Sequence, residues 1–217
     1  LGDNENRNYN NCDNSGVKKY TFVNDQFWTN KIVEFWDNYF PELETTVKNT
    51  NLVNGVASSY YGFSNTGLAI HKCKYENGGD YPEFLIKITI KAYYRKLSEY
   101  KPNLLVYVPP TKSGNLVRNF AEKISQQLSL PISHNLVKSR QTAEQKIFEN
   151  SYLKSENIKE AFSYSYPTEI IGKTILLIDD IYDSGATIKE IGTYLSNLGA
   201  KKIVPLVIAK TVGGDSI

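Results

Sequence analysis

The segment 173–209 reads KTILLIDDIYDSGATIKEIGTYLSNLGAKKIVPLVIA and decides the fold class. Lys173 to Ile178 is an apolar run that predicts a buried strand, and Ile203 to Ala209 predicts a second one. Ile188 to Asn197 has helical spacing, and Gly199 suits the end of that helix. A strand, a helix and a second parallel strand form a βαβ unit, which predicts an α/β fold with a central parallel sheet flanked by helices.

The residues between the first strand and the helix predict a ligand site, because parallel sheets bind ligands beyond the carboxyl ends of their strands. Four small residues open the expected helix, and their N–H groups and the helix dipole favour a phosphate: Ser184, Gly185, Ala186 and Thr187. Gly185 permits a tight backbone, and Thr187 can cap the helix. Asp179 and Asp180 would repel a phosphate, so we expect them to face sugar hydroxyls or a divalent metal. A ribose 5-phosphate has this combination of groups.

Further elements are expected upstream of this unit. The predicted strands are Val56–Phe63, Leu104–Val108 and Pro131–Ile132, and the predicted helices are Asp25–Phe40, Gly67–Lys74, Phe84–Leu97 and Asn115–Leu128. The polar segment Leu136–Phe162 has two interpretations, a long mobile excursion or a pair of surface helices.

Composition excludes several classes of protein. With 217 residues, 41% hydrophobic and 22% charged, the chain is globular and not disordered throughout. A net charge of +2 argues against a chain-wide surface for nucleic acid, and the apolar runs are far too short to cross a membrane. We therefore expect a cytoplasmic protein. Two cysteines are too few for a four-cysteine zinc site. The chain begins at Leu1 and has no Met, which predicts a trimmed protein or a piece of a longer one.

The stretch Ile178–Thr187 resembles the phosphoribosyl pyrophosphate (PRPP) signature of type I phosphoribosyltransferases, in which an apolar strand and an acidic pair precede a phosphate loop. More specifically, the chain resembles the ComF-like, competence-associated branch of that family. The matching residues are Tyr61, Gly62, Ile70, His71, Lys74, Tyr75, Arg140, Thr142, Gln145, Asn157, Ala161 and Phe162. The chain departs from this branch because it lacks the N-terminal zinc ribbon and reduces a basic element to Arg118-Asn119-Phe120.

We expect the chain to divide into three parts. The polar composition of residues 1–16 predicts a flexible leader. Residues 17–58 are expected to form an N-terminal helical extension or hood, and the resemblance implies a phosphoribosyltransferase-like domain over 59–212. It also implies that the protein binds PRPP with Mg²⁺, transfers phosphoribose to a nitrogenous base or amine, and releases pyrophosphate.

The resemblance further implies a role for individual residues. Asp179 and Asp180 would hold the ribose hydroxyls, directly or through Mg²⁺, and the residues from Asp183 to Thr187 would bind the 5-phosphate. Three residues would meet the pyrophosphate: Thr111, Lys112 and Ser113. Arg140 and Gln145 would lie on a flexible loop that closes over the site. The implied catalytic residues are Asp183, Arg140 and Lys112.

Some alternatives stay open at this point. Asp183 is either a contact to the base or a simple loop cap, and Lys74 either faces the site or is an ordinary exposed lysine. The protein is either an enzyme or a non-catalytic module, for PRPP or nucleotide sensing or for binding a partner, of a DNA-uptake system or of a RecQ-type DNA helicase to which it is fused. Homodimers are common among the related transferases, so a homodimer is a further expectation.

Overall fold

The computed structural model describes residues 8–10, 19–21, 39–61, 64–76, 79–110, 114–140 and 151–211. Strands β1 (Asn8–Asn10) and β2 (Lys19–Thr21) pair antiparallel near the N-terminus. Most of the helix predicted at Asp25–Phe40 lies outside the described residues. Within the part that the structure describes, no helix combines the length and apolar character needed to span a membrane.

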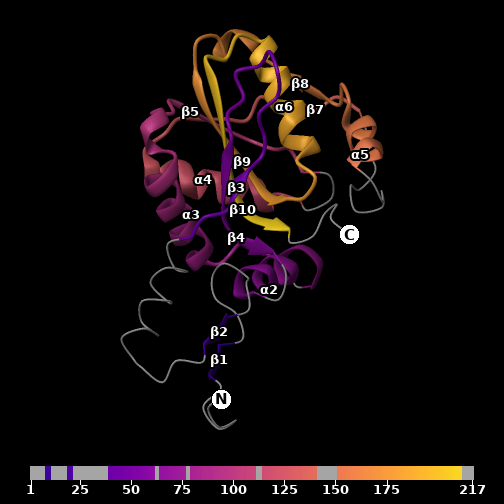
Figure 1. Cartoon of the computed structure of the whole chain (residues 1–217). Helices are drawn as coiled ribbons and strands as arrows, with labels where there is room; N and C mark the ends of the chain where they lie inside the picture. Colours follow the sequence, from indigo (N-terminus) through magenta and orange to yellow (C-terminus); the bar gives the residue numbers. More distant parts are fainter. Residues whose placement is uncertain are drawn as a thin grey trace.

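The central element is a six-stranded sheet in the order β3-β4-β10-β9-β5-β6 (Figure 1). Its strands are β3 (Glu42–Leu43), β4 (Gly55–Tyr61), β5 (Leu104–Tyr107), β6 (Ile132–Ser133), β9 (Thr174–Tyr182) and β10 (Lys202–Thr211). β3 runs antiparallel to β4, and every other neighbouring pair in this sheet is parallel. The predicted α/β fold with a mostly parallel sheet is therefore confirmed. The predicted boundary between residues 58 and 59 falls inside β4, and the division into domains stays a prediction.

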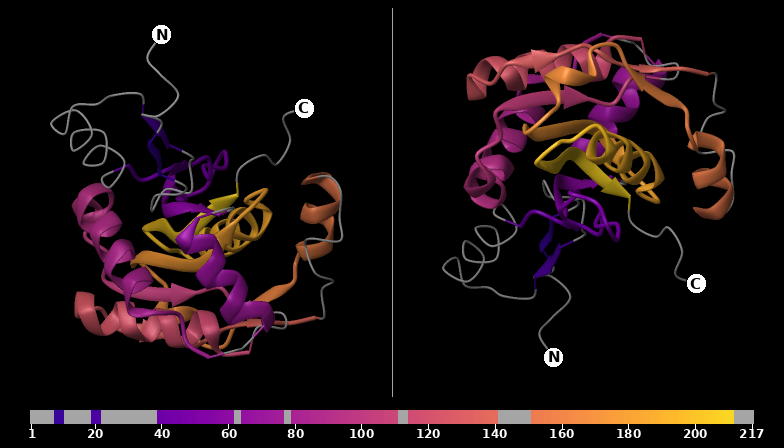
Figure 2. Two further views of the ribbon diagram at one scale, coloured as in Figure 1. Left: turned by 90° about the horizontal axis from the view of Figure 1, so that it is seen from below. Right: turned by 90° about the horizontal axis from the view of Figure 1, so that it is seen from above.

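Helices cover both faces of this sheet (Figure 2). One face carries α2 (Asn65–His71), α3 (Glu83–Lys96) and α4 (Leu116–Leu128), and the other carries α6 (Ala186–Asn197) with α5 (Ser151–Ile158) beside it. A π-helix (Lys72–Glu76) continues α2, and two 3-10 turns, Ser98–Tyr100 and Pro167–Glu169, complete the elements.

Strand β9 shows how the sequence fills both cores. Leu176 and Ile178 belong to the core under α3 and α4, whereas Ile175 and Leu177 belong to the core under α6. Successive side chains of a strand point to opposite faces, so a continuous apolar run is required when both faces are covered. All four side chains are fully buried.

One local prediction is wrong, and a second, for Leu136–Phe162, is tested only in part because residues 141–150 lie outside the described residues. The strand expected to end at Ile178 continues to Tyr182, because β10 keeps pairing with it through Asp179, Ile181 and Tyr182. The acidic pair therefore lies in a strand and not in a loop. Within Leu136–Phe162, the described residues form strand β7 (Leu136–Lys138) and α5, and β8 (Phe162–Tyr164) pairs antiparallel with β7.

A carboxylate fastens this hairpin to the main sheet. Glu169 Oε2 accepts hydrogen bonds from Ser133 Oγ at 2.7 Å, Asn135 Nδ2 at 2.9 Å and Tyr164 Oη at 2.6 Å. Ser133 is in β6 and Tyr164 in β8, so one carboxylate oxygen joins both strands. β7 is thereby held at a fixed position beside the end of the sheet.

Candidate functional site

The N-terminus of α6 forms one end of the candidate site. The residues from Asp183 to Gly185 turn the chain from β9 into the helix, and Ser184 Oγ accepts a long hydrogen bond from the Ala186 N–H at 3.4 Å. The first N–H groups of a helix have no acceptor within the helix itself. A small pocket of about 70 Å³ is lined by Asp179 and by the residues from Ile181 to Ile188. The helix dipole favours an anion at this pocket, and the binding of a phosphate here stays a prediction.

Gly185 makes this turn possible. Its φ is 75° and its ψ is 0°, a left-handed conformation that an L side chain adopts only at a cost. A Cβ atom at this position would also lie 2.6 Å from Tyr182 Cζ, and the Tyr182 hydroxyl donates to the Glu44 carbonyl oxygen at 3.1 Å. Gly185 is the N-cap residue, so the expectation that Thr187 caps the helix is wrong; Thr187 is the second residue of α6.

The two carboxylates of the acidic pair have different surroundings. Asp179 lines the phosphate pocket, whereas Asp180 bonds to Tyr81, a residue of the core under α3 and α4. Adjacent strand residues point to opposite faces, which accounts for the difference. The Asp180 N–H donates to Asp179 Oδ1 at 2.8 Å. Burial, followed by the charge of Asp180, raises the pKa of Asp179 to about 7.

Asp180 is held by an ion pair that joins two distant parts of the chain. Lys74 Nζ lies 2.8 Å from Asp180 Oδ2, and the Tyr81 hydroxyl donates to the same oxygen at 2.9 Å. The Lys74 side chain is 16% exposed and that of Asp180 only 8%. Burial would lower the pKa of Lys74, but the Asp180 charge and hydrogen bond outweigh it and raise the pKa. Of the two alternatives for Lys74, the structure selects the one that faces the site.

Lys138, at the end of β7, is a second cation near the pair. Burial lowers the pKa of its half-buried ammonium, and the negative charge of Asp179 opposes that effect. The sequence analysis did not single out Lys138 or Tyr81. Neither residue belongs to a local motif. The signal for Lys138 is the alternation of apolar and polar residues in β7, and the signal for Tyr81 is an aromatic residue with a hydroxyl group next to a glycine-rich turn.

The remaining predicted residues are placed as follows. Asp183 Oδ1 accepts a hydrogen bond from Thr211 Oγ1 at 3.0 Å, which joins the phosphate loop to the end of β10. Arg140 Nη2 donates to the Lys159 carbonyl oxygen at 2.6 Å, next to the end of α5. Four predicted residues lie outside the described part of the chain: Thr111, Lys112, Ser113 and Gln145.

A Mg²⁺ ion held directly by Asp180 does not fit this geometry. Asp180 Oδ2 already contacts an ammonium group, and Lys138 adds a second positive charge near Asp179. Within the described ranges, no group of three or more His, Cys, Asp or Glu side chains is arranged to hold a metal ion. Indirect association of Mg²⁺ with the pair stays a prediction.

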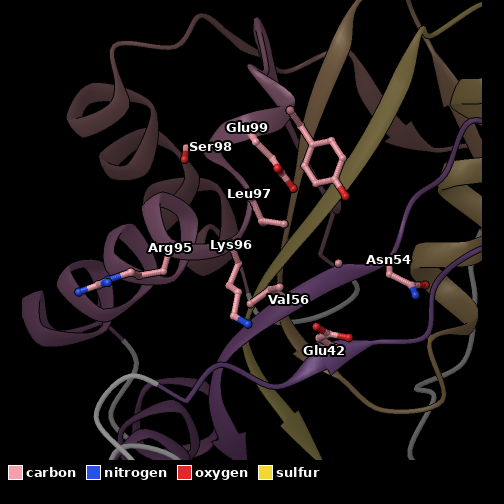
Figure 3. A pocket seen from close by; sticks show the side chains of 10 residues that line it. Glu42, Asn54, Val56, Arg95, Lys96, Leu97, Ser98 and Glu99 are labelled. Carbon is pink, nitrogen blue, oxygen red and sulfur yellow. The ribbon is translucent and has the colours of Figure 1, made fainter. Parts of the chain in front are cut away.

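A second pocket, of about 450 Å³, lies where β4 begins and α3 ends (Figure 3). Four charged residues are among those that line it: Glu42, Arg95, Lys96 and Glu99. Because β4 and β9 both run parallel to β10, the start of β4 lies at the amino ends of the parallel strands, whereas the end of β9 lies at their carboxyl ends. None of the predicted site residues lines this pocket, so we assign it no part in the chemistry.

A comparison of the sequence with models of protein families identifies the family of this chain. The family model described as the phosphoribosyl transferase domain matches residues 79–212, more than half of the chain. The chain belongs to this family. The match includes the acidic pair, the turn after β9 and α6, whereas Lys74 precedes the matched residues. No curated protein matches the chain.

Several solved structures are similar to parts of this phosphoribosyl transferase domain. The allosteric regulatory enzyme of purine biosynthesis is 20% identical over 57% of this chain and 24% of its own, with a TM-score of 0.39. The glutamine PRPP amidotransferase from B. subtilis is 17% identical over 48% of this chain and 22% of its own, with a TM-score of 0.33. The purine phosphoribosyltransferase from Pyrococcus horikoshii Ot3 is 17% identical over 62% of this chain and 87% of its own, with a TM-score of 0.38. The match thus spans less than a quarter of the first two proteins.

Proposed function

We propose that this chain binds PRPP and transfers its phosphoribosyl group to a nitrogenous base or amine, with release of pyrophosphate. The observation that carries the proposal is that Asp179 and the N-terminal residues of α6 line one pocket. A helix N-terminus favours a phosphate, and a carboxylate accepts hydrogen bonds from sugar hydroxyls. The two ends of a ribose 5-phosphate therefore find matching groups in one place.

The reaction exchanges one bond at the anomeric carbon for another. The bond to the pyrophosphate oxygen breaks with its electron pair leaving on pyrophosphate, and the acceptor nitrogen forms the new bond. Such a displacement needs fixed positions and charge stabilisation more than a nucleophilic side chain. Asp183 is our candidate for contacting the acceptor. Arg140 and Lys112 are our candidates for contacting pyrophosphate, and Thr111, Ser113 and Gln145 stay candidates beside them.

Mg²⁺ is the cofactor that we propose, and it would supply positive charge at the pyrophosphate. A homodimer, a cytoplasmic location, membership of the ComF-like branch and a link to a DNA helicase or another DNA-processing partner stay predictions.

Calorimetric titration with PRPP tests this proposal. We expect saturable binding, and we expect Asp179→Asn combined with Asp180→Asn to abolish it while circular dichroism stays unchanged. Glu83→Gln combined with Glu99→Gln is the matched control, because it also removes two carboxylates but from exposed positions, one at the start of α3 and one in the 3-10 turn that follows this helix. If the folded wild-type chain does not bind PRPP, or if the Asp179/Asp180 double variant binds it with unchanged affinity, the proposal is refuted.

The alternative is a sensor that binds PRPP without turning it over. Pyrophosphate release in the presence of a panel of bases and amines separates the two functions. Release that depends on one acceptor supports the transferase. PRPP binding without release for every acceptor supports the sensor.

A further inference from the structure

The segment that precedes α3 reaches the acidic pair from outside the sheet. It supplies both Lys74, from the π-helix, and Tyr81, and their polar atoms meet on one oxygen of Asp180 at 2.8 Å and 2.9 Å. Within the described part of the chain, the contacts of the Asp180 carboxylate are on Oδ2 alone. This pairing fixes the orientation of the Asp180 carboxylate next to Asp179, which lines the pocket at the start of α6.

The same segment is anchored on α4, so the position of Tyr81 is itself supported. Asp80 accepts hydrogen bonds from Asn119 Nδ2 at 2.7 Å and from Lys123 Nζ at 2.8 Å. The ring of Phe120 packs edge-on against Tyr81, with 5.8 Å between ring centroids. In the short Arg118-Asn119-Phe120 element, Asn119 thus anchors Asp80, the neighbour of Tyr81, and Phe120 packs on Tyr81 itself.

The negative charges of Asp179 and Asp180 are balanced by nearby lysines. Two adjacent buried carboxylates repel each other and would repel a phosphate bound nearby, and a buried charge is tolerated only when it is paired. The Lys74 ammonium neutralises Asp180 at contact distance, and Lys138 acts on Asp179. The chain therefore provides, from its own side chains, the positive charge that a metal ion would otherwise bring to the pair.

We propose that Lys74 is a positioning residue that serves as a built-in cation for the acidic pair: it fixes Asp180 beside Asp179, the member of the pair that lines the pocket, and makes recognition of the ribose of a ribose 5-phosphate independent of Mg²⁺. Tyr81 assists by fixing the same oxygen. This inference rests on the proposed function, because it concerns how the same site recognises the sugar.

The readout is the ratio of two affinities measured by calorimetry on the full chain, that for ribose 5-phosphate divided by that for inorganic phosphate. General electrostatic effects change both affinities and cancel in the ratio, whereas contacts to the sugar do not. We expect the wild-type ratio to be the same in EDTA and in Mg²⁺. We expect Lys74→Met to lower it about tenfold, the effect of losing one hydrogen bond to a charged group. Lys72→Met removes the same charge from an exposed position two residues away, and we expect it to leave the ratio unchanged.

A double-variant cycle distinguishes positioning from direct contact. If Lys74 acts through Asp180, Lys74→Met should lower the ratio in the wild-type chain but change it less than about twofold in an Asp180→Asn background. Tyr81→Phe keeps the ring that packs on Phe120, and we expect it to lower the ratio severalfold; it provides the test if Lys74→Met does not fold.

Each contrary outcome is distinct. The inference about Lys74 is overturned if the wild-type ratio requires Mg²⁺, or if the Lys72→Met and Lys74→Met variants have equal ratios. In either case the proposed function still stands as long as the wild-type chain binds PRPP. Equal losses with and without the Asp180 carboxylate overturn the positioning role. Failure of the wild-type chain to bind PRPP refutes the proposed function itself.

Discussion

Replacing Asp179 by Asn should stabilise the fold at neutral pH. Asp179 is 9% exposed, and burial and the neighbouring Asp180 charge raise its pKa from the usual 3.8 to about 7. The folded state therefore keeps a proton on Asp179 that the unfolded state has released between these two pH values. Stability falls as pH rises through this range, because the folded state binds more protons there.

The magnitude follows from the two pKa values. Their difference corresponds to a penalty of about 4 kcal/mol once the pH exceeds the folded pKa, and we take this as an upper limit. Asn keeps an oxygen in the position that accepts from the Asp180 N–H, so the hydrogen bond at 2.8 Å can persist. We therefore expect Asp179→Asn to raise the free energy of unfolding by about 1–4 kcal/mol at pH 8 and to have little effect near pH 4.

Urea unfolding at a series of pH values between 4 and 8 measures this difference. Asp80→Asn provides a contrast of opposite sign. Hydrogen bonds from Lys123 and Asn119 lower the pKa of the exposed Asp80, so its ionised form favours the folded state. That contribution is present above the usual pKa of an Asp and is lost as pH falls through the lowered value, so Asp80→Asn should destabilise slightly at pH 8 and not in acid. Equal stability of wild-type and Asp179→Asn proteins at pH 8, or a gain that does not depend on pH, would refute the reasoning about Asp179.

Two further substitutions test the turn and the hairpin. Gly185→Ala should lower the free energy of unfolding by more than the roughly 1–2 kcal/mol expected of a left-handed alanine, because its Cβ also collides with Tyr182. Gly199 has a φ of 91°, but a Cβ there would have no neighbour closer than 3.7 Å, so Gly199→Ala measures the conformational cost alone. Equal losses of stability for the two variants in thermal unfolding would contradict the collision. Glu169→Ala should lower the free energy of unfolding by about 2 kcal/mol, because it removes the acceptor that the Tyr164 hydroxyl shares with two other donors. Glu169→Gln keeps an oxygen at this position and should lower the free energy of unfolding less. An unchanged urea midpoint for Glu169→Ala would show that the network does not stabilise the hairpin.

The parts of the site that follow one another in the chain could be predicted from the sequence. The acidic pair, Gly185 and the start of α6 lie within one βαβ unit, where the order of strand, turn and helix determines which groups meet. The continuous apolar run before Asp179 predicted a strand buried on both faces, and both core clusters contain its residues. Local periodicity is sufficient for such features.

The end of β9 could not be predicted from its own residues, because it depends on pairing with β10. Asp179, Asp180 and Tyr182 read as a polar loop, yet they continue the strand because β10 is ten residues long and supplies backbone partners for Asp179 and Tyr182. The pairing partner, and not local propensity, decides where such a strand ends.

What the sequence by itself determined is therefore the fold class and the order of strand, turn and helix around the candidate site, since both depend on short-range patterns of burial and turn residues. What only the tertiary structure decided is the charge around the acidic pair. Lys74 and Tyr81 lie about a hundred residues from Asp180 along the chain, and Lys138 belongs to a hairpin that a separate network fastens to the sheet. Ion pairs between such distant residues leave no periodic trace in a sequence, because they depend on how whole elements pack and not on the spacing within any one of them.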